Sequence, residues 1–202
     1  MKVLKGILIV LVILIAIPLI AAIFVSKDLN YEQSVEIEAP IDHVWEQVNS
    51  LQDMDKWSPW NEYDPNMEKE WSGAEGSVGS TQSWVSDHEN VGVGSQTIAK
   101  VEAPNLMETD LKFMTPFESV AKAHVKLDEM AEGTKVTWGF ESEMPYPFNL
   151  MKVFVDFDAA MDKDFGIGLG KLKAIAESTL PTPEPAVEEL EVEGEAEASD
   201  SE

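Results

Sequence analysis

Residues 105–144, NLMETDLKFMTPFESVAKAHVKLDEMAEGTKVTWGFESEM, decide the fold, because apolar and polar side chains alternate through most of this stretch. Turn-forming residues, Pro116 and the Glu132-Gly133 pair, divide it into segments 105–114, 118–130 and 134–144. Alternation with a period of two places one face of each strand against a core and the other face in water. Connections this short join antiparallel strands. The stretch therefore predicts an antiparallel sheet that is covered on one side.

The same patterning extends toward the N-terminus. Segments rich in alternating or β-branched residues predict four more strands, at 31–39, 67–72, 80–87 and 93–103. Pro40 is expected to open a short helix that contains Val44 and Trp45. Residues 51–65, LQDMDKWSPWNEYDP, are expected to form a loop.

A long helix that covers the sheet is predicted after the last strand, from Phe148 to about Ser178. Its apolar residues step by three or four positions and form one stripe: Leu150, Phe154, Phe157, Met161, Phe165, Gly168, Leu172 and Ile175. Gly166, Gly168 and Gly170 would each weaken a helix by up to about 1 kcal/mol relative to alanine. Such a cluster indicates either a kink or a close approach of the helix to the sheet.

The first residues have the composition of a membrane helix. Gly6–Val25 is a run of 20 residues without a charge, and as a helix it would be about 30 Å long, the thickness of the hydrocarbon core of a bilayer. We expect residues 1–28 to form a single transmembrane anchor; a cleaved secretory signal is the alternative. Lys2 and Lys5 favour a cytoplasmic N-terminus, which would place the domain, residues 31–179, on the extracytoplasmic (periplasmic) side.

The last residues, 180–202, form an acidic tail. Three prolines fall within its first six residues, and 181–202 holds nine acidic residues and no basic one. Such a segment cannot bury enough apolar surface to offset the entropy lost on ordering. The tail is therefore predicted to be disordered.

Composition excludes several classes of function. The formal net charge is −24, and all 14 basic residues are lysine, which argues against a nucleic-acid partner because such proteins need a basic surface. Cysteine is absent, and the three histidines have no metal-ligand spacing. No motif of a nucleophilic enzyme, zinc protease or P-loop occurs. We therefore assign no catalytic residue, metal or cofactor, although Asp158 or Asp164 could act as a general acid if it were desolvated.

Four segments resemble one protein family. They are VEIEAPIDHVWEQV at 35–48, KWSPW at 56–60, GTKVTW at 133–138 and GLGKLKAIAE at 168–177. Together with the order of elements, they are similar to the helix-grip fold of the START-like, or SRPBCC, superfamily, in its polyketide cyclase/dehydrase and lipid-transport group. The resemblance covers about residues 32–178. It implies an α+β fold in which a curved antiparallel sheet is wrapped on a long C-terminal helix, here preceded by the transmembrane helix.

The resemblance also implies a cavity between sheet and helix. Its expected ligand-binding residues are inward-facing aromatics and one methionine, with Trp57 and Trp60 at the mouth: Trp57, Trp60, Trp84, Phe113, Trp138, Phe140, Phe157, Met161 and Phe165. The expected function is membrane-anchored, non-catalytic binding of a lipid or other hydrophobic small molecule, with membrane contact through residues 6–25. The alternatives are an enzyme resembling polyketide cyclases or dehydratases, and an adaptor protein at the membrane surface.

Overall fold

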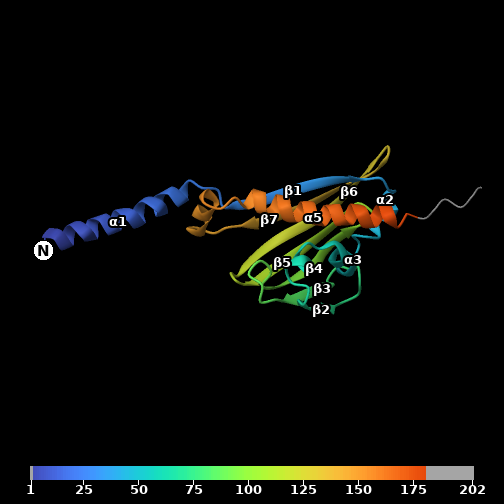
Figure 1. Cartoon of the computed structure of the whole chain (residues 1–202), viewed down its shortest axis with the longest axis horizontal. Coiled ribbons are helices and arrows are strands. Elements are labelled where there is room, and N and C mark those ends of the chain that lie inside the picture. The colour runs from blue at the N-terminus through green and yellow to red at the C-terminus, as the bar shows by residue number, and fades with distance from the viewer. Residues whose placement is uncertain (1, 181–202) are drawn as a thin grey trace, which may run out of the picture.

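The computed structural model describes residues 2–180, so the predicted disordered tail lies, except for Leu180, outside the described residues. The strands form one antiparallel sheet in the order β1-β7-β6-β5-β4-β3-β2 (Figure 1). The strands are β1 (Asp28–Ile37), β2 (Glu68–Ser72), β3 (Thr81–Val85), β4 (Val93–Glu102), β5 (Leu106–Thr115), β6 (Ser119–Met130) and β7 (Gly133–Glu143). Each predicted strand is present, although β1 begins three residues before the predicted start of the domain.

The helices lie at the ends of the chain and between the first two strands. They are α1 (Lys2–Ile23), α2 (Ile41–Trp45), α3 (Leu51–Trp57), α4 (Trp60–Tyr63), the 3-10 helix η1 (Phe148–Val153) and α5 (Phe157–Ser178). Helix α5 crosses the inner face of the sheet, as Figure 1 shows. The arrangement confirms the predicted helix-grip α+β fold.

The core lies where α2, α3 and α5 meet the sheet. Its fully buried side chains come from these elements and from the connection between α2 and α3: Val44, Val48, Leu51, Leu127, Val136 and Leu172. The inward phase predicted from alternation is confirmed in β6, where Ala121, Ala123, Val125 and Leu127 are buried.

Two secondary-structure predictions are wrong, the start of the long helix and the loop at 51–65, and in each case a helix cap is the reason. The carboxylate of Asp156 accepts the backbone N–H of Ala159 at 3.0 Å and starts α5, so the helix does not run unbroken from Phe148. Phe154, predicted to belong to the buried stripe, is 79% exposed. Residues 51–65 are not simply a loop, because Ser50 accepts the N–H of Asp53 at 3.1 Å and caps α3.

One glycine brings α5 close to the sheet. A Cβ atom built on Gly168 would lie 2.8 Å from the ring of Trp138 and 3.3 Å from Pro59, whereas a Cβ on Gly170 would meet no atom within 4 Å. Of the two alternatives that the glycine cluster indicates, a kink or a close approach to the sheet, the close approach is present at Gly168.

Replacement by alanine is expected to have opposite effects on stability at Gly168 and Gly170. Gly168→Ala should lower the free energy of unfolding by about 1–2 kcal/mol, because the overlap with Trp138 outweighs the gain in helix propensity. Gly170→Ala should raise it by about 0.5–1 kcal/mol. Urea denaturation followed by circular dichroism measures both, and a stabilising Gly168→Ala would show that the contact is loose.

Helix α1 is the one described helix that is long and apolar enough to cross a membrane. A signal sequence has the same composition near an N-terminus. The orientation predicted from Lys2 and Lys5 stays a prediction.

Candidate ligand-binding site

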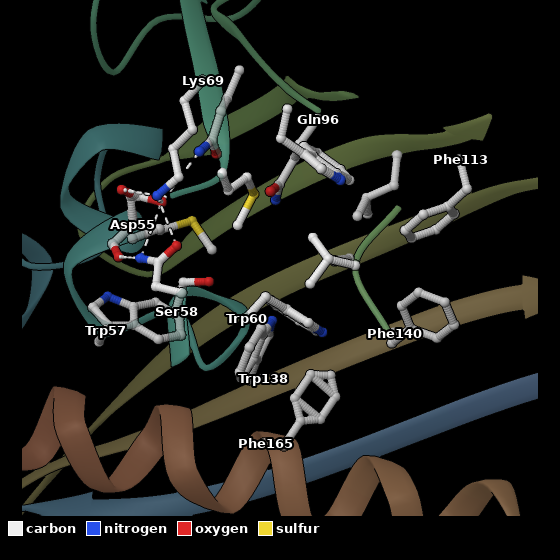
Figure 2. Close-up of a pocket in the computed structure, with 18 of the residues that line it drawn as sticks. Asp55, Trp57, Ser58, Trp60, Lys69, Gln96, Phe113, Trp138, Phe140 and Phe165 are labelled. Carbon is white, nitrogen blue, oxygen red and sulfur yellow. Dashed lines mark hydrogen bonds and ion pairs between the residues drawn. The ribbon is translucent and has the colours of Figure 1, made fainter. Parts of the chain in front are cut away.

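A cavity of about 250 Å³ lies between the inner face of the sheet, α5 and the segment from α3 to α4 (Figure 2). Its walls are mainly aromatic rings and methionines, contributed by strands β3, β5 and β7 and by α3, α4 and α5. Several of these rings meet edge to face.

Eight of the nine residues predicted from the sequence line this cavity: Trp57, Trp60, Trp84, Phe113, Trp138, Phe140, Met161 and Phe165. Phe157 does not line it, because α5 starts there and the cavity begins one turn later, at Met161. Trp57 was expected at the mouth of the cavity but is instead buried, with 1% of its surface exposed. Its Nε1–H donates to the backbone carbonyl of Gln47 at 2.9 Å.

Trp138 is the centre of the aromatic wall. Its ring packs edge to face against Trp57 at 5.0 Å, Trp60 at 5.7 Å and Phe165 at 3.9 Å between centroids. Tyr31 stacks on Phe165 at 5.3 Å between ring centroids. Such rigid rings make one continuous apolar wall for the cavity.

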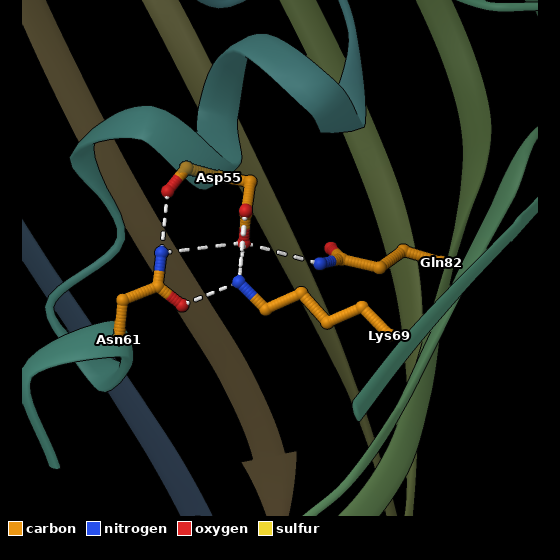
Figure 3. Close-up of polar contacts among 4 residues, drawn as sticks. All are labelled: Asp55, Asn61, Lys69 and Gln82. Carbon is orange, nitrogen blue, oxygen red and sulfur yellow. Dashed lines mark hydrogen bonds and ion pairs between the residues drawn. The ribbon is translucent and has the colours of Figure 1, made fainter. Parts of the chain in front are cut away.

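One end of the cavity is polar. Lys69 on β2 contacts both carboxylate oxygens of Asp55 on α3 at 2.8 Å and the side-chain oxygen of Asn61 at 2.7 Å (Figure 3). Asn61 donates to the backbone carbonyl of Asp55 at 2.7 Å, and Gln82 donates to the Asp55 carboxylate at 3.2 Å. The ion pair is about four-fifths buried, and the charges neutralise each other. This end of the cavity is polar without carrying a net charge.

Sequence reasoning missed this polar end. Neither Asp55 nor Lys69 is among the ligand-binding residues expected from the sequence. In the structure, strand register shows that Lys69 faces inward, because it lies directly opposite Trp84. Asp55 gave no signal, since only the unpredicted helix α3 turns its side chain toward β2.

A second polar contact joins α4 to the segment 86–92, which lies beside the cavity. The hydroxyl of Ser86 donates to the carboxylate of Asp64, which follows α4. This contact fixes residues 86–92, in which Asn90 and Val91 line the cavity. The hydrogen bond from Ser86 lowers the pKa of Asp64, and the N–H of Asn66 and the nearby His88 act in the same direction.

A lowered pKa in the folded state predicts a pH dependence of stability. The contribution of Asp64 is present above the ordinary aspartate pKa of about 4 and is lost as the pH falls through the lowered value. Asp64→Asn should therefore be less stable than the wild type at pH 7, and the difference should shrink in acid. Urea midpoints from pH 7 to pH 3 measure this, and a difference that is constant with pH would contradict it.

Metal ligands are scarce around the cavity. Within residues 2–180, no three His, Asp or Glu side chains lie close enough together to hold a metal ion. The imidazole of His43 is largely covered by the end of α5, where its Nε2 lies 3.0 Å from the carbonyl oxygen of Ala176.

A curved antiparallel sheet gripping a C-terminal helix around an aromatic cavity defines a helix-grip, START-like protein. Residues 28–177 match the family model described as polyketide cyclase / dehydrase and lipid transport. The chain belongs to this family, and its START-like resemblance is confirmed. No curated protein matches the sequence.

Solved structures share the fold at low sequence identity. A solution structure of a protein from Arthrobacter aurescens has 19% identity and a TM-score of 0.53, covering 81% of this chain and 92% of that one. A crystal structure of a protein from Mesorhizobium loti has 14% identity and a TM-score of 0.54, covering 75% and 98%. The di-domain ARO/CYC StfQ from the steffimycin biosynthetic pathway has 8% identity and a TM-score of 0.57, covering 75% and 51%. At these identities the likeness concerns the fold.

Proposed function

We propose that this protein binds a lipid or another hydrophobic small molecule in the cavity, without chemical conversion, while α1 holds the domain at a membrane. The observation that carries the proposal is the cavity of about 250 Å³ with its wall of aromatic rings. Ligand pockets in proteins are typically about 300–1,000 Å³. The space therefore suits a small ligand, or one part of a larger ligand that extends beyond the cavity.

The polar end narrows the chemistry of the ligand. Asp55 and Lys69 neutralise each other, so a charged ligand group would have no unpaired opposite charge to meet at this pair. The amides of Gln82 and Gln96 also line the cavity and suit hydroxyl or carbonyl groups. We infer that the ligand is amphipathic, with an uncharged polar group near Asp55 and Lys69 and an apolar part among the aromatic rings.

The proposed membrane anchor rests on the length and the apolar composition of α1. Its 22 residues, Lys2–Ile23, span about 33 Å at 1.5 Å per residue, enough for a bilayer core. Lys2 and Lys5 support a cytoplasmic N-terminus, with the cavity-bearing domain on the extracytoplasmic side.

Native mass spectrometry of the full chain, extracted in a mild detergent, tests the binding proposal. We expect a population with added mass that organic solvent releases as an intact amphipathic compound. Only the mass of the bare chain, with no uptake from a panel of phospholipids, fatty acids and isoprenoids, would contradict it.

An enzyme is the second candidate, and the inward-facing Asp55 and Lys69 favour it because an acid and a base share one cavity. Incubating the released compound with the full chain separates the two functions. A binder leaves the mass of the compound unchanged. Loss of the mass of one water, abolished by Asp55→Asn, would instead identify a dehydratase or cyclase.

A further inference from the structure

Large apolar side chains are exposed at one end of the domain. Strand register defines this end: Asp28 at the start of β1 pairs with Glu143 at the end of β7, and Phe113 near the end of β5 pairs with Ser119 at the start of β6. Figure 1 shows that α1 leaves the domain from the same end. The exposed side chains here form what we call the α1-side surface: Phe24, Phe117, Val120, Phe148, Val153 and Phe154.

This surface is tied to the last turns of α1. The side-chain amide of Asn149, in η1, donates to the carbonyls of Ala22 and Val25 at 2.7 and 2.8 Å, and Asn149 is fully buried. The hydroxyl of Tyr146 donates to the carbonyl of Leu19 at 3.3 Å. The η1 segment therefore packs beside α1 itself and not only beside the linker that follows it.

The contact between Tyr146 and Leu19 sets how deep the residues around η1 lie in a bilayer that α1 spans. Leu19 lies six residues before Val25, the end of the uncharged run, and six residues of helix span about 9 Å. The polar layer on each side of a bilayer core is about 5–7 Å thick. A chain whose α1 spans the membrane must therefore carry Tyr146 and Phe148 into the interfacial layer. Tyrosine, like tryptophan, is enriched at this depth in membrane proteins.

We propose that the α1-side surface is a second membrane-contact site, in which η1 and the β5–β6 turn rest in the lipid interface beside α1. Its occupant is the bilayer that α1 spans. The contact is apolar in origin, because a chain with a formal net charge of −24 gains nothing from anionic lipid headgroups. The proposal rests on the anchor part of the proposed function and not on the ligand.

The surface also orients the cavity. Figure 2 shows Phe113 and Phe140 at the end of the cavity opposite Asp55 and Lys69, and Phe113 lies next to the β5–β6 turn. Contact of this turn with lipid turns the apolar end of the cavity toward the bilayer and the polar end away from it.

The absence of cysteine from the sequence makes a direct test possible. Single-cysteine variants Phe117→Cys and Phe148→Cys of the full chain would carry an environment-sensitive fluorophore in phosphatidylcholine vesicles. Both side chains are exposed, so the substitutions should not affect folding. We expect doxyl-labelled phosphatidylcholine to quench both labels several times more strongly than a label at Glu132→Cys, in the β6–β7 turn at the other end of the sheet.

A label at Ile13→Cys, in the middle of α1, separates two failures. Quenching at Ile13 together with quenching at Phe117 or Phe148 no greater than at Glu132 would overturn the second contact site and leave the anchor intact. Lack of quenching at Ile13 would overturn the anchor and the contact site together. Neither outcome bears on ligand binding, which the mass measurement reports independently.

Discussion

A Leu111→Trp variant is expected to lose most of its bound ligand, with the occupied fraction falling about tenfold at limiting ligand. Leu111 lines the cavity from β5, and an indole ring there would fill space that the ligand needs. Overpacking of a protein interior costs about 1–3 kcal/mol, and 1.4 kcal/mol corresponds to about a factor of ten in affinity. Native mass spectrometry of the full chain, incubated with the compound released from the wild type, measures the occupied fraction.

Lys112→Trp is the matched control. It introduces the same side chain one position along β5, where Lys112 is exposed on the outer face of the sheet. This variant should keep wild-type occupancy. Equal occupancy in both tryptophan variants would place the ligand outside the cavity.

The largest expected effect on stability comes from Trp138→Ala, which should lower the free energy of unfolding by about 3–5 kcal/mol. Trp138 is 4% exposed and joins Trp57, Trp60 and Phe165. Its ring also lies directly under Gly168 of α5. Removing it deletes the contact that connects α3, α4 and α5 to β7, and the truncation leaves a void among rigid neighbours that cannot close around it.

Chemical denaturation of the full chain in detergent, followed by far-ultraviolet circular dichroism, measures this loss. Trp71→Ala is the control, because Trp71 lies on the edge strand β2 and is 38% exposed; it should cost below about 1 kcal/mol. A Trp138→Ala variant no less stable than Trp71→Ala would contradict the central role of this ring. If Trp138→Ala does not fold, Trp138→Phe should show an intermediate loss.

The sheet was predictable because apolar and polar residues alternate along its strands. In β6, four alternating apolar residues face inward and the intervening residues face outward. The two-residue period of the apolar positions therefore predicts which face of the strand is buried. The aromatic wall followed from the same phase together with the family resemblance. The start of α5 was not predictable in this way, because Leu150, Phe154 and Phe157 keep helical spacing across a break that the Asp156 cap creates.

The polar end of the cavity lay beyond sequence reasoning for a different reason. Asp55 and Lys69 are 14 residues apart and reach each other only through the pairing of β2 with β3 and the turn of α3. Neither segment carries a periodic pattern that orients its polar side chains. In a chain with 38 acidic residues, no single aspartate stands out by composition.

The account depends most on an unfilled space between the sheet and α5. A high-resolution crystal structure of the full chain, purified from a membrane in mild detergent, tests it most directly. We expect continuous density for an elongated molecule between Trp138 and Phe113, with its polar group beside Lys69. Side chains that close the space completely, with no density among them, would contradict the account.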